Sequence, residues 1–309
     1  MKVTVIIPAY NAEATITETI RSVLEQTLQP SEVVVVNDGS QDSTQVEVQK
    51  FGDRVRLINQ KNQGVSAARN HGIALSKTEW VSFLDSDDTW LPEKLAEQAK
   101  LLAANPELDW CSTRYWVCGS PRFLSSYLSD KHLPEGNQHR IDALDAISTT
   151  VNIWVSTVVI KKEVVEAAGG FCTELSSTAD NDLWIRVASK SREIGFVNQP
   201  LANYRLDPGS MSAAAGRSIS ASRYNFFDRL AEYIQNSDSE LRCYYERIFD
   251  RYVGNYMFNV ARSGNVNESR QLAQWLRSNN YRLPGWRYRW IHWVPSGLIN
   301  FARKMRRKA

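Results

Sequence analysis

Short apolar runs alternate with helix-forming stretches through the first hundred residues of this 309-residue chain. The apolar runs are predicted strands, and the VVVV of the second run is typical of a strand buried on both faces of a sheet. Each run precedes a predicted helix, and this repeat predicts a doubly wound, mostly parallel sheet with right-handed crossovers, an α/β fold. The predicted strands cover residues 3–7, 32–36, 55–59 and 80–84.

After Pro106 the alternation is lost. The pattern there predicts longer strands, short helices, a loop-rich stretch at 119–140 and a breaker-rich loop at 207–217. From about Ser218 onward the chain is predicted to be helical. We therefore expect one domain at residues 1–215 and a C-terminal helical extension at 216–309. The later predicted strands cover 108–117, 153–160, 194–197 and 201–204, and the short helices cover 163–168 and 183–188.

The loops that follow the first four strands all carry polar side chains or glycine. They span residues 8–11, 37–40, 59–64 and 85–88. In open parallel sheets, ligands bind beyond the carboxyl ends of the strands. We therefore expect these four loops to form one binding site. Asn11 is also a predicted N-cap for the helix that follows the first strand.

Three carboxylates, Asp85, Asp87 and Asp88, follow the fourth strand within four residues. Because like charges so close together repel, a compensating cation is expected. Oxygen ligands from a short loop suit Mg²⁺ or Mn²⁺, which usually share their other positions with phosphate. The alternative is a solvated acidic turn that leads into the next helix, with Pro92 in its first turn.

The net charge of +3 conceals a basic C-terminal segment. Ten Lys or Arg residues and no Asp or Glu lie between Arg270 and Ala309, and Trp286, Trp290 and Trp293 recur among them at helical spacing. This pattern fits a helix on an anionic membrane surface, and equally an aromatic helix packed against the body of the protein. No nucleic-acid-binding pattern is recognisable.

The four cysteines show no metal-ligand spacing, and the first apolar run is too short for a signal core or a membrane span. We expect a cytoplasmic protein, which would lie on the inner face of the membrane if the basic segment binds a membrane surface and does not pack on the body.

Seven sequence segments, taken together and in their order along the chain, match the pattern of a known protein family. They are VTVIIPAYN, EVVVVNDGSQDST, NQGVSAARNHGI, FLDSDDTW, VVEAAGGF, ADNDLWIRVA and QPLANYRLDPGSMS. Together they resemble the family 2 inverting glycosyltransferases of the GT-A fold, over roughly residues 1–215. The resemblance implies that fold and transfer of a sugar from a nucleotide-sugar donor.

The resemblance also implies roles for single residues. Asp38 would accept a hydrogen bond from a uracil imide, a role that suits an acceptor-only carboxylate. Gly64 would let the backbone approach the nucleotide, and Arg69 would help hold that wall of the site. The nucleotide would be lined from the first loop by Pro8, Tyr10 and Asn11.

The aspartate loop and one later aspartate would carry the chemistry. By resemblance, Asp85 would contact ribose or metal, Ser86 belongs to the same nucleotide site, and Asp87 would hold the Mn²⁺ or Mg²⁺ that bridges the diphosphate. Asp180, aligned on Leu183-Trp184, would be the general base. On residue pattern alone, Asp180 could instead be a helix N-terminal residue favoured by the macrodipole.

The reaction that the resemblance implies is a single displacement with inversion. A UDP-sugar is the expected donor, and a hydroxyl of a glycan or lipid-linked acceptor would attack it, as in surface polysaccharide or glycolipid assembly. Two departures from the family pattern bear on rate and metal preference, namely Ala179 in place of Glu and Asp207 in place of His. The alternatives are a nucleotidyltransferase and a non-enzymatic nucleotide-sugar binder.

Overall fold

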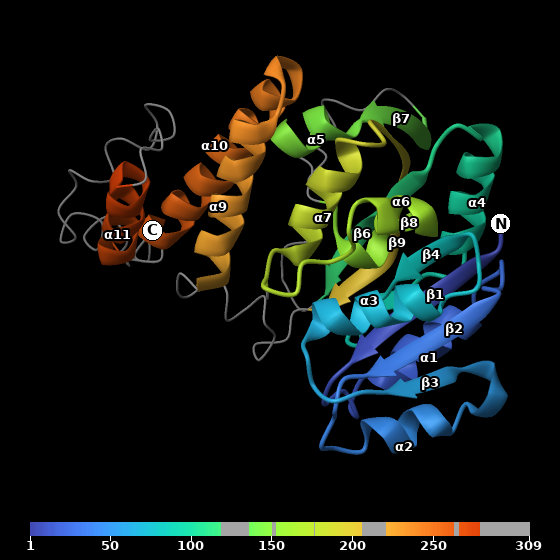
Figure 1. The fold of residues 1–309 in the computed structure, drawn as a ribbon. Coiled ribbons are helices and arrows are strands. Elements are labelled where there is room, and N and C mark those ends of the chain that lie inside the picture. The colour runs from blue at the N-terminus through green and yellow to red at the C-terminus, as the bar shows by residue number, and fades with distance from the viewer. Residues whose placement is uncertain (119–135, 150–152, 176, 206–220, 263–265, 279–309) are drawn as a thin grey trace, which may run out of the picture. The chain divides into compact units, whose positions relative to one another are not determined.

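The computed structural model describes residues 1–118, 136–149, 153–175, 177–205, 221–262 and 266–278 (Figure 1). The chain divides into two compact units, Met1–Asp207 and Pro208–Ala309. Residue Asp207, which departs from the family pattern, and the aromatic basic segment after residue 278 lie outside the described residues.

A nine-stranded sheet forms the centre of the first unit as far as the structure describes it, with the strand order β3-β2-β1-β4-β8-β6-β9-β5 and with β7 paired to β9. The four strands β3, β2, β1 and β4 are parallel, whereas β8 runs antiparallel to both β4 and β6. The strands are β1 (Val3–Ala9), β2 (Glu32–Asn37), β3 (Arg56–Asn59), β4 (Trp80–Phe83), β5 (Thr89–Trp90), β6 (Trp110–Cys118), β7 (Gln138–Asp142), β8 (Val159–Lys161) and β9 (Glu193–Arg205).

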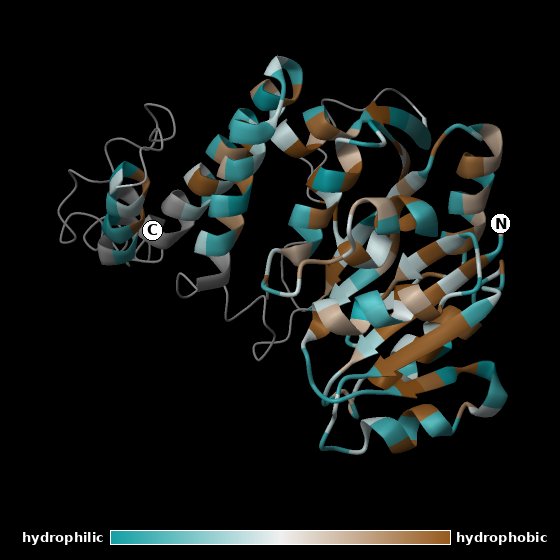
Figure 2. Ribbon diagram, in the orientation of Figure 1, coloured by the Kyte–Doolittle hydropathy of each residue, from teal (hydrophilic) through white to brown (hydrophobic). Residues whose placement is uncertain are grey.

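Helices cover both faces of the parallel part of the sheet. Val33 and Val35 of β2 belong to the large core that includes Ile16 and Ile20 of α1. The alternate residues Val34 and Val36 pack with Ala68 of α3 on the other face. Hydropathy colouring shows β2 as an almost continuous hydrophobic strand, as its burial on both faces requires (Figure 2). The helices of this unit are α1 (Ile16–Leu24), α2 (Thr44–Gln49), α3 (Val65–Leu75), α4 (Lys94–Ala104), α5 (Ala143–Thr149), α6 (Lys162–Ala167) and α7 (Ala179–Ala188).

The α/β fold with a doubly wound parallel portion is therefore confirmed, but several predicted elements were wrong. Only Val159 and Ile160 of the predicted strand at 153–160 lie in a strand, β8. Val155–Thr157 form a 3₁₀ turn, in which the backbone N–H and the hydroxyl of Thr157 both donate to the carbonyl of Trp154. The two short strands predicted after residue 193 are one long strand, β9, which passes through Pro200 where the pairing with β6 is irregular.

Two smaller predictions also failed. Residues 138–140, predicted as loop, begin β7, and Asn11 does not cap α1. The N-cap position is Thr15, whereas Asn11 adopts a left-handed φ of 49°. Its side-chain Oδ1 accepts a hydrogen bond from the backbone N–H of Gln41 at 2.9 Å, which joins the loops after β1 and β2.

The second unit contains the predicted helical extension, and aromatic side chains form much of its core. Phe227 contacts Trp275 with ring centroids 6.2 Å apart, and it also contacts Phe249 and Tyr256. Within the described part of the chain, no helix combines the length and the apolar character needed to cross a membrane. The helices of this unit are α9 (Ala221–Asn236), α10 (Ser239–Arg262) and α11 (Val266–Ser278).

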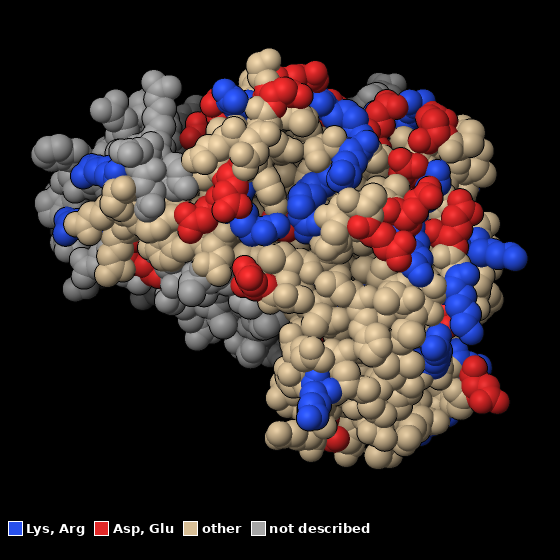
Figure 3. Space-filling model, viewed as in Figure 1, with Lys and Arg blue, Asp and Glu red and all other residues tan. Residues whose placement is uncertain are grey.

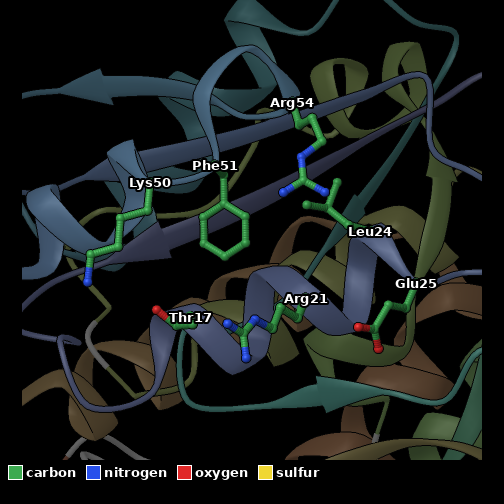
Figure 4. A pocket seen from close by; sticks show the side chains of 7 residues that line it. All are labelled: Thr17, Arg21, Leu24, Glu25, Lys50, Phe51 and Arg54. Atoms are coloured by element: carbon green, nitrogen blue, oxygen red, sulfur yellow. The ribbon is translucent and has the colours of Figure 1, made fainter.

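A pocket of about 300 Å³ lies between α1 and the segment around α2 (Figure 4). None of the residues predicted for the nucleotide site lines it. On the face shown in Figure 3, acidic and basic side chains are interspersed over the upper part of the first unit, whereas its lower part is mostly uncharged. The pocket therefore does not belong to the predicted site. Its lining consists of Thr17, Arg21, Leu24, Glu25, Lys50, Phe51 and Arg54.

Candidate functional site

Backbone hydrogen bonds tie together the predicted site loops at the carboxyl ends of β1, β2 and β3. The backbone N–H of Asp38 donates to the carbonyl of Ala9 at 2.8 Å, and that of Gln60 donates to Asn37 at 3.0 Å. These contacts connect each loop to its neighbour along the sheet edge. The fold therefore brings the polar loops to one place, as their positions in the sequence predict.

Asp38 lies at the centre of these loops and is buried. Its carboxylate accepts hydrogen bonds from the Gln60 side chain (2.8 Å) and from the backbone N–H groups of Gln63 (2.9 Å) and Gly64 (2.8 Å). Gly64 has a φ of +89°, a conformation that glycine adopts without strain. Asp38 thus shapes the loop after β3. Of the roughly four acceptor positions on a carboxylate, these bonds use three and leave one for a ligand.

The first loop presents one predicted residue to solvent and buries another. Tyr10 is 49% exposed, so its ring is available for a ligand at the sheet edge. Pro8 instead lies inside β1, opposite Val36, and is buried. Asn11 is exposed and joins neighbouring loops through its side chain.

The three aspartates after β4 have different environments. Asp85 and Asp87 are half-buried, whereas Asp88 is fully buried. The Asp88 carboxylate accepts hydrogen bonds from the backbone N–H of Arg205 (3.0 Å) and from the hydroxyl of Ser156 (3.2 Å). Burial, with Asp85 and Asp87 nearby, raises the pKa of Asp88 well above its usual value. Asp88 therefore holds the loop in place, and Asp85 and Asp87 are the aspartates that remain partly exposed to solvent.

Two neighbouring elements fix the backbone of the same loop. The hydroxyls of Thr15 and Thr19 on α1 donate to the carbonyl of Ser86 at 2.8 and 2.9 Å. The backbone N–H of Asp85 donates to Ser156 Oγ at 3.1 Å. The backbone carbonyl of Ser86 thus attaches the loop to α1. The sequence gives no signal for Ser156 or the two threonines, because their contacts with the loop span 67 to 71 residues of chain.

Arg69 lies beneath the aspartate loop. Only 6% of this residue is exposed, and its Nη2 atom lies 2.5 Å from Asp85 Oδ1. The guanidinium carbon lies 5.1 Å from the centroid of the Phe171 ring. That Arg69 helps to bind the nucleotide stays a prediction. In the structure its contacts are with the aspartate loop and with Phe171.

Asp180 lies in the first turn of α7. Burial of its carboxyl raises its pKa above the usual value, the charge of Arg69 opposes that rise, and the charge of Asp85 adds to it. These electrostatic effects show that the fold brings Asp180 near Arg69 and Asp85, which are 111 and 95 residues away in the sequence. The preceding residue, Ala179, is buried.

Asp182, two residues after Asp180, has a structural role. It is fully buried, and its Oδ2 atom lies 2.7 Å from Nη2 of Arg186. Arg186 also donates to the backbone carbonyls of Ala168 and Gly170. This arrangement attaches α7, and with it Asp180, to the glycine turn that follows α6.

Asn70 holds the same turn from α3. Its Nδ2 donates to the carbonyl of Phe171, and its Oδ1 accepts the backbone N–H of Phe171, both at 2.8 Å. The sequence pattern gives no sign of this role for Asn70, although Asn70 lies beside Arg69 in the NQGVSAARNHGI segment. The turn is thus bound by α3 on one side and by α7 on the other.

We expect Gly170→Ala to destabilise the protein by about 2 to 3 kcal/mol, for two reasons. Gly170 has a φ of +66°, where a side chain costs about 1 to 2 kcal/mol, and an added Cβ would lie 2.7 Å from Asn70 Oδ1. Gly52→Ala is the matched control, because Gly52 has a φ of +55° and open space around its Cβ. Urea denaturation should show a larger loss for Gly170→Ala, and equal losses would contradict the close contact.

A divalent metal would have to take part of its coordination from a ligand. Among the described residues, no group of three or more His, Cys, Asp or Glu side chains is arranged to hold a metal ion. Asp85 is half-buried beside its Arg69 partner, and Asp87 is half-buried on the same loop. One or two carboxylates that share a cation with phosphate oxygens are characteristic of Mg²⁺ sites, so these residues fit such a metal.

Known proteins resemble this chain in sequence. The sequence profile described as Glycosyl transferase family 2 matches residues 4–166. The chain is 26% identical over 238 residues to the Escherichia coli UDP-Glc:alpha-D-GlcNAc-diphosphoundecaprenol beta-1,3-glucosyltransferase WfgD, with 76% of this chain and 87% of that protein covered. It is 30% identical over 200 residues to an uncharacterized glycosyltransferase of Haemophilus influenzae, with 64% and 66% covered.

The fold is similar to that of a solved structure. The crystal structure of S. aureus TarS residues 1–349 in complex with UDP-GlcNAc matches with a TM-score of 0.67 and 19% identity, and covers 90% of this chain and 92% of that one. The first unit thus has the GT-A fold that the sequence resemblance implies. From the profile match over more than half of its length, the chain belongs to glycosyl transferase family 2.

Proposed function

We propose that this protein transfers a sugar from a UDP-sugar to a hydroxyl group of a glycan or lipid-linked acceptor, with inversion at the anomeric carbon and with a divalent metal. The observation that carries the proposal is the proximity of Asp180 to Asp85 and Arg69. A carboxylate from a helix far away in the sequence thus lies within electrostatic range of the aspartate loop, and a single displacement requires such a general base near the reacting groups.

The nucleotide part of the proposal is supported by the loops and by the relatives. Asp38 retains one acceptor position and Tyr10 is exposed on the neighbouring loop. WfgD is named for a UDP-Glc donor, and TarS was crystallised with UDP-GlcNAc. A uridine diphosphate placed across these loops would bring its phosphates to the end of β4, where Asp85 and Asp87 lie.

Asp180 would remove the proton of the acceptor hydroxyl while its oxygen attacks the anomeric carbon. The bond from that carbon to the diphosphate oxygen breaks in the same step, and the nucleoside diphosphate leaves with the electron pair. The raised pKa of Asp180 makes it a stronger base than an ordinary aspartate. When bound, a divalent cation supplies positive charge for the leaving diphosphate, and Asp87 and Asp85 are the residues placed to hold it.

The test is metal-dependent release of UDP from a panel of UDP-sugars, with and without candidate glycan acceptors. Release from one sugar in the presence of Mn²⁺ or Mg²⁺ would support donor and metal together. Release of pyrophosphate would indicate a nucleotidyltransferase, and UDP binding without turnover in the presence of acceptors would indicate a nucleotide-sugar binder. Failure to bind UDP would contradict the role of Asp38.

We further propose that the protein works on the cytoplasmic face of the membrane, held there by its basic aromatic C-terminal segment. Each basic residue near an anionic surface contributes about 1 kcal/mol. Replacing Arg303, Lys304, Arg306, Arg307 and Lys308 with Gln should therefore abolish flotation with phosphatidylglycerol-containing vesicles. The wild type should float with these vesicles and not with phosphatidylcholine vesicles. Equal flotation of the variant would contradict the proposal.

A further inference from the structure

Arg69 is a buried cation whose contacts are with protein groups of the site. Its Nη2 atom is bound to Asp85, its guanidinium stacks on Phe171, and its Nε atom is buried without a hydrogen-bond partner among the described residues. An arginine stays charged when buried, so its surroundings must compensate that charge. The compensation comes from Asp85 and, through space, from Asp180.

Phe171 joins the two parts of the site that carry these aspartates. Its ring packs edge-on against Phe83, the last residue of β4, with centroids 5.1 Å apart. On another side it packs against Trp184 of α7, with centroids 6.3 Å apart. Asp85 lies two residues after Phe83, and Asp180 lies four residues before Trp184. Phe171 therefore sets the spacing between the aspartate loop and the start of α7.

The polar contacts of α3 hold this arrangement together. The side chain of Asn70 binds both the N–H and the carbonyl of Phe171. Arg69, the preceding residue, stacks on the Phe171 ring and binds Asp85. Two adjacent residues of α3 thus hold both Phe171 and the aspartate loop. Two carboxylates close to one another repel, and a cation between them offsets that repulsion.

We propose that Arg69 is a positioning residue, which holds Asp85 at a fixed distance from Asp180 and offsets the repulsion between the two carboxylates. It therefore acts on the sugar-transfer step and, apart from the metal that Asp85 would help to hold, not on the binding of the nucleotide. This inference rests on the proposed role of Asp180 as the base. It differs from the role that the family resemblance implies, in which Arg69 supports the nucleotide wall.

The test compares Arg69→Met and Arg69→Lys with the wild type, in kcat, in KM for the donor and in the Kd of UDP. This Kd is measured calorimetrically without divalent metal, so that a metal held by Asp85 does not contribute to it. Misplacement of reacting groups by about 1 Å can cost about 100-fold in rate. We therefore expect Arg69→Met to lower kcat about 100-fold and to change the Kd of UDP by less than about twofold. Arg69→Lys keeps the charge and should restore kcat about tenfold relative to Arg69→Met.

Arg56→Met is the matched control, because Arg56 pairs with Glu32 at 3.2 Å on β2 and takes no part in the site. It should leave kcat and the Kd of UDP unchanged. A rise of tenfold or more in the Kd of UDP for Arg69→Met, with kcat unchanged, would overturn the inference and restore Arg69 to the nucleotide wall. Absence of turnover by the wild type would instead contradict the proposed function.

A second measurement does not depend on activity or on ligand binding. Removing Arg69 leaves the partly buried Asp85 carboxylate uncompensated, so Arg69→Met should lower the Tm. In an Asp85→Asn background that carboxylate is already absent, and the same change should lower the Tm by less than half as much. Equal shifts in both backgrounds would show that the two residues are not coupled and would overturn the inference. Arg69→Gln, which also removes the positive charge, replaces Arg69→Met in this cycle if the latter does not fold.

Discussion

Asp180→Asn is expected to lower kcat by about 10²- to 10⁴-fold, the range typical of the loss of a general base. Asparagine has nearly the same shape and cannot take the proton of the acceptor hydroxyl. UDP should bind with unchanged affinity, because the nucleotide loops lie after β1, β2 and β3 whereas Asp180 lies on α7. The measurement is steady-state transfer or donor hydrolysis, together with calorimetric UDP binding.

The pH dependence gives a second check on the same residue. Only the deprotonated carboxylate can act as the base, so activity should fall as the pH drops through the pKa of Asp180. Burial raises that pKa above the usual 3.8, and Arg69 limits the rise. The acidic limb of kcat should therefore lie at a higher pH than for an ordinary aspartate. The Asp180→Asn variant should lack this limb.

Glu163→Gln is the control for a helix N-terminal carboxylate. Glu163 lies in the first turn of α6, as Asp180 does in α7, and it is exposed. The Glu163→Gln variant should lose only the interaction of this carboxylate with the helix dipole, and the enzyme should keep full activity. If Asp180→Asn changed the Tm and left kcat intact, Asp180 would be a structural residue of its helix and the proposed base would be wrong.

Removal of divalent metal is the second large expected effect. Chelation with EDTA should lower the activity of the wild type by at least about 100-fold, because a cation opposite a leaving diphosphate contributes several kcal/mol. Asp87→Asn should raise the Mn²⁺ or Mg²⁺ concentration for half-maximal activity by about tenfold or more, since Asp87 is a partly exposed carboxylate of the loop at the end of β4. A metal titration of both proteins measures this.

Asp88→Asn is the matched control within the same loop. Asp88 is fully buried and bound to Arg205 and Ser156, so its replacement should affect stability and leave the metal requirement unchanged. Activity of the wild type that is indifferent to EDTA would contradict metal dependence. A shift in metal requirement for Asp88→Asn as large as that for Asp87→Asn would contradict the separate roles of the two aspartates.

The sequence by itself determined the parallel half of the sheet and the loops that form the site. Hydrophobic periodicity is local, and runs such as the VVVV of β2 can satisfy their burial only as a strand covered on both faces. The polar residues after these strands must then meet at one edge, because parallel strands end on the same side. The positions of Asp38, Asp85 and Asp87 could therefore be predicted.

Only the tertiary structure decided how the burial of three neighbouring aspartates, Asp85, Asp87 and Asp88, differs and what Arg69 contacts. Asp88 is buried by Ser156 and by the end of β9, elements that are far from it in the sequence. Arg69 meets Asp85 because α3 packs on the sheet beside β1 and brings it under the loop. Such contacts join segments that carry no shared local pattern, and their energies depend on burial, which the order of residues does not display.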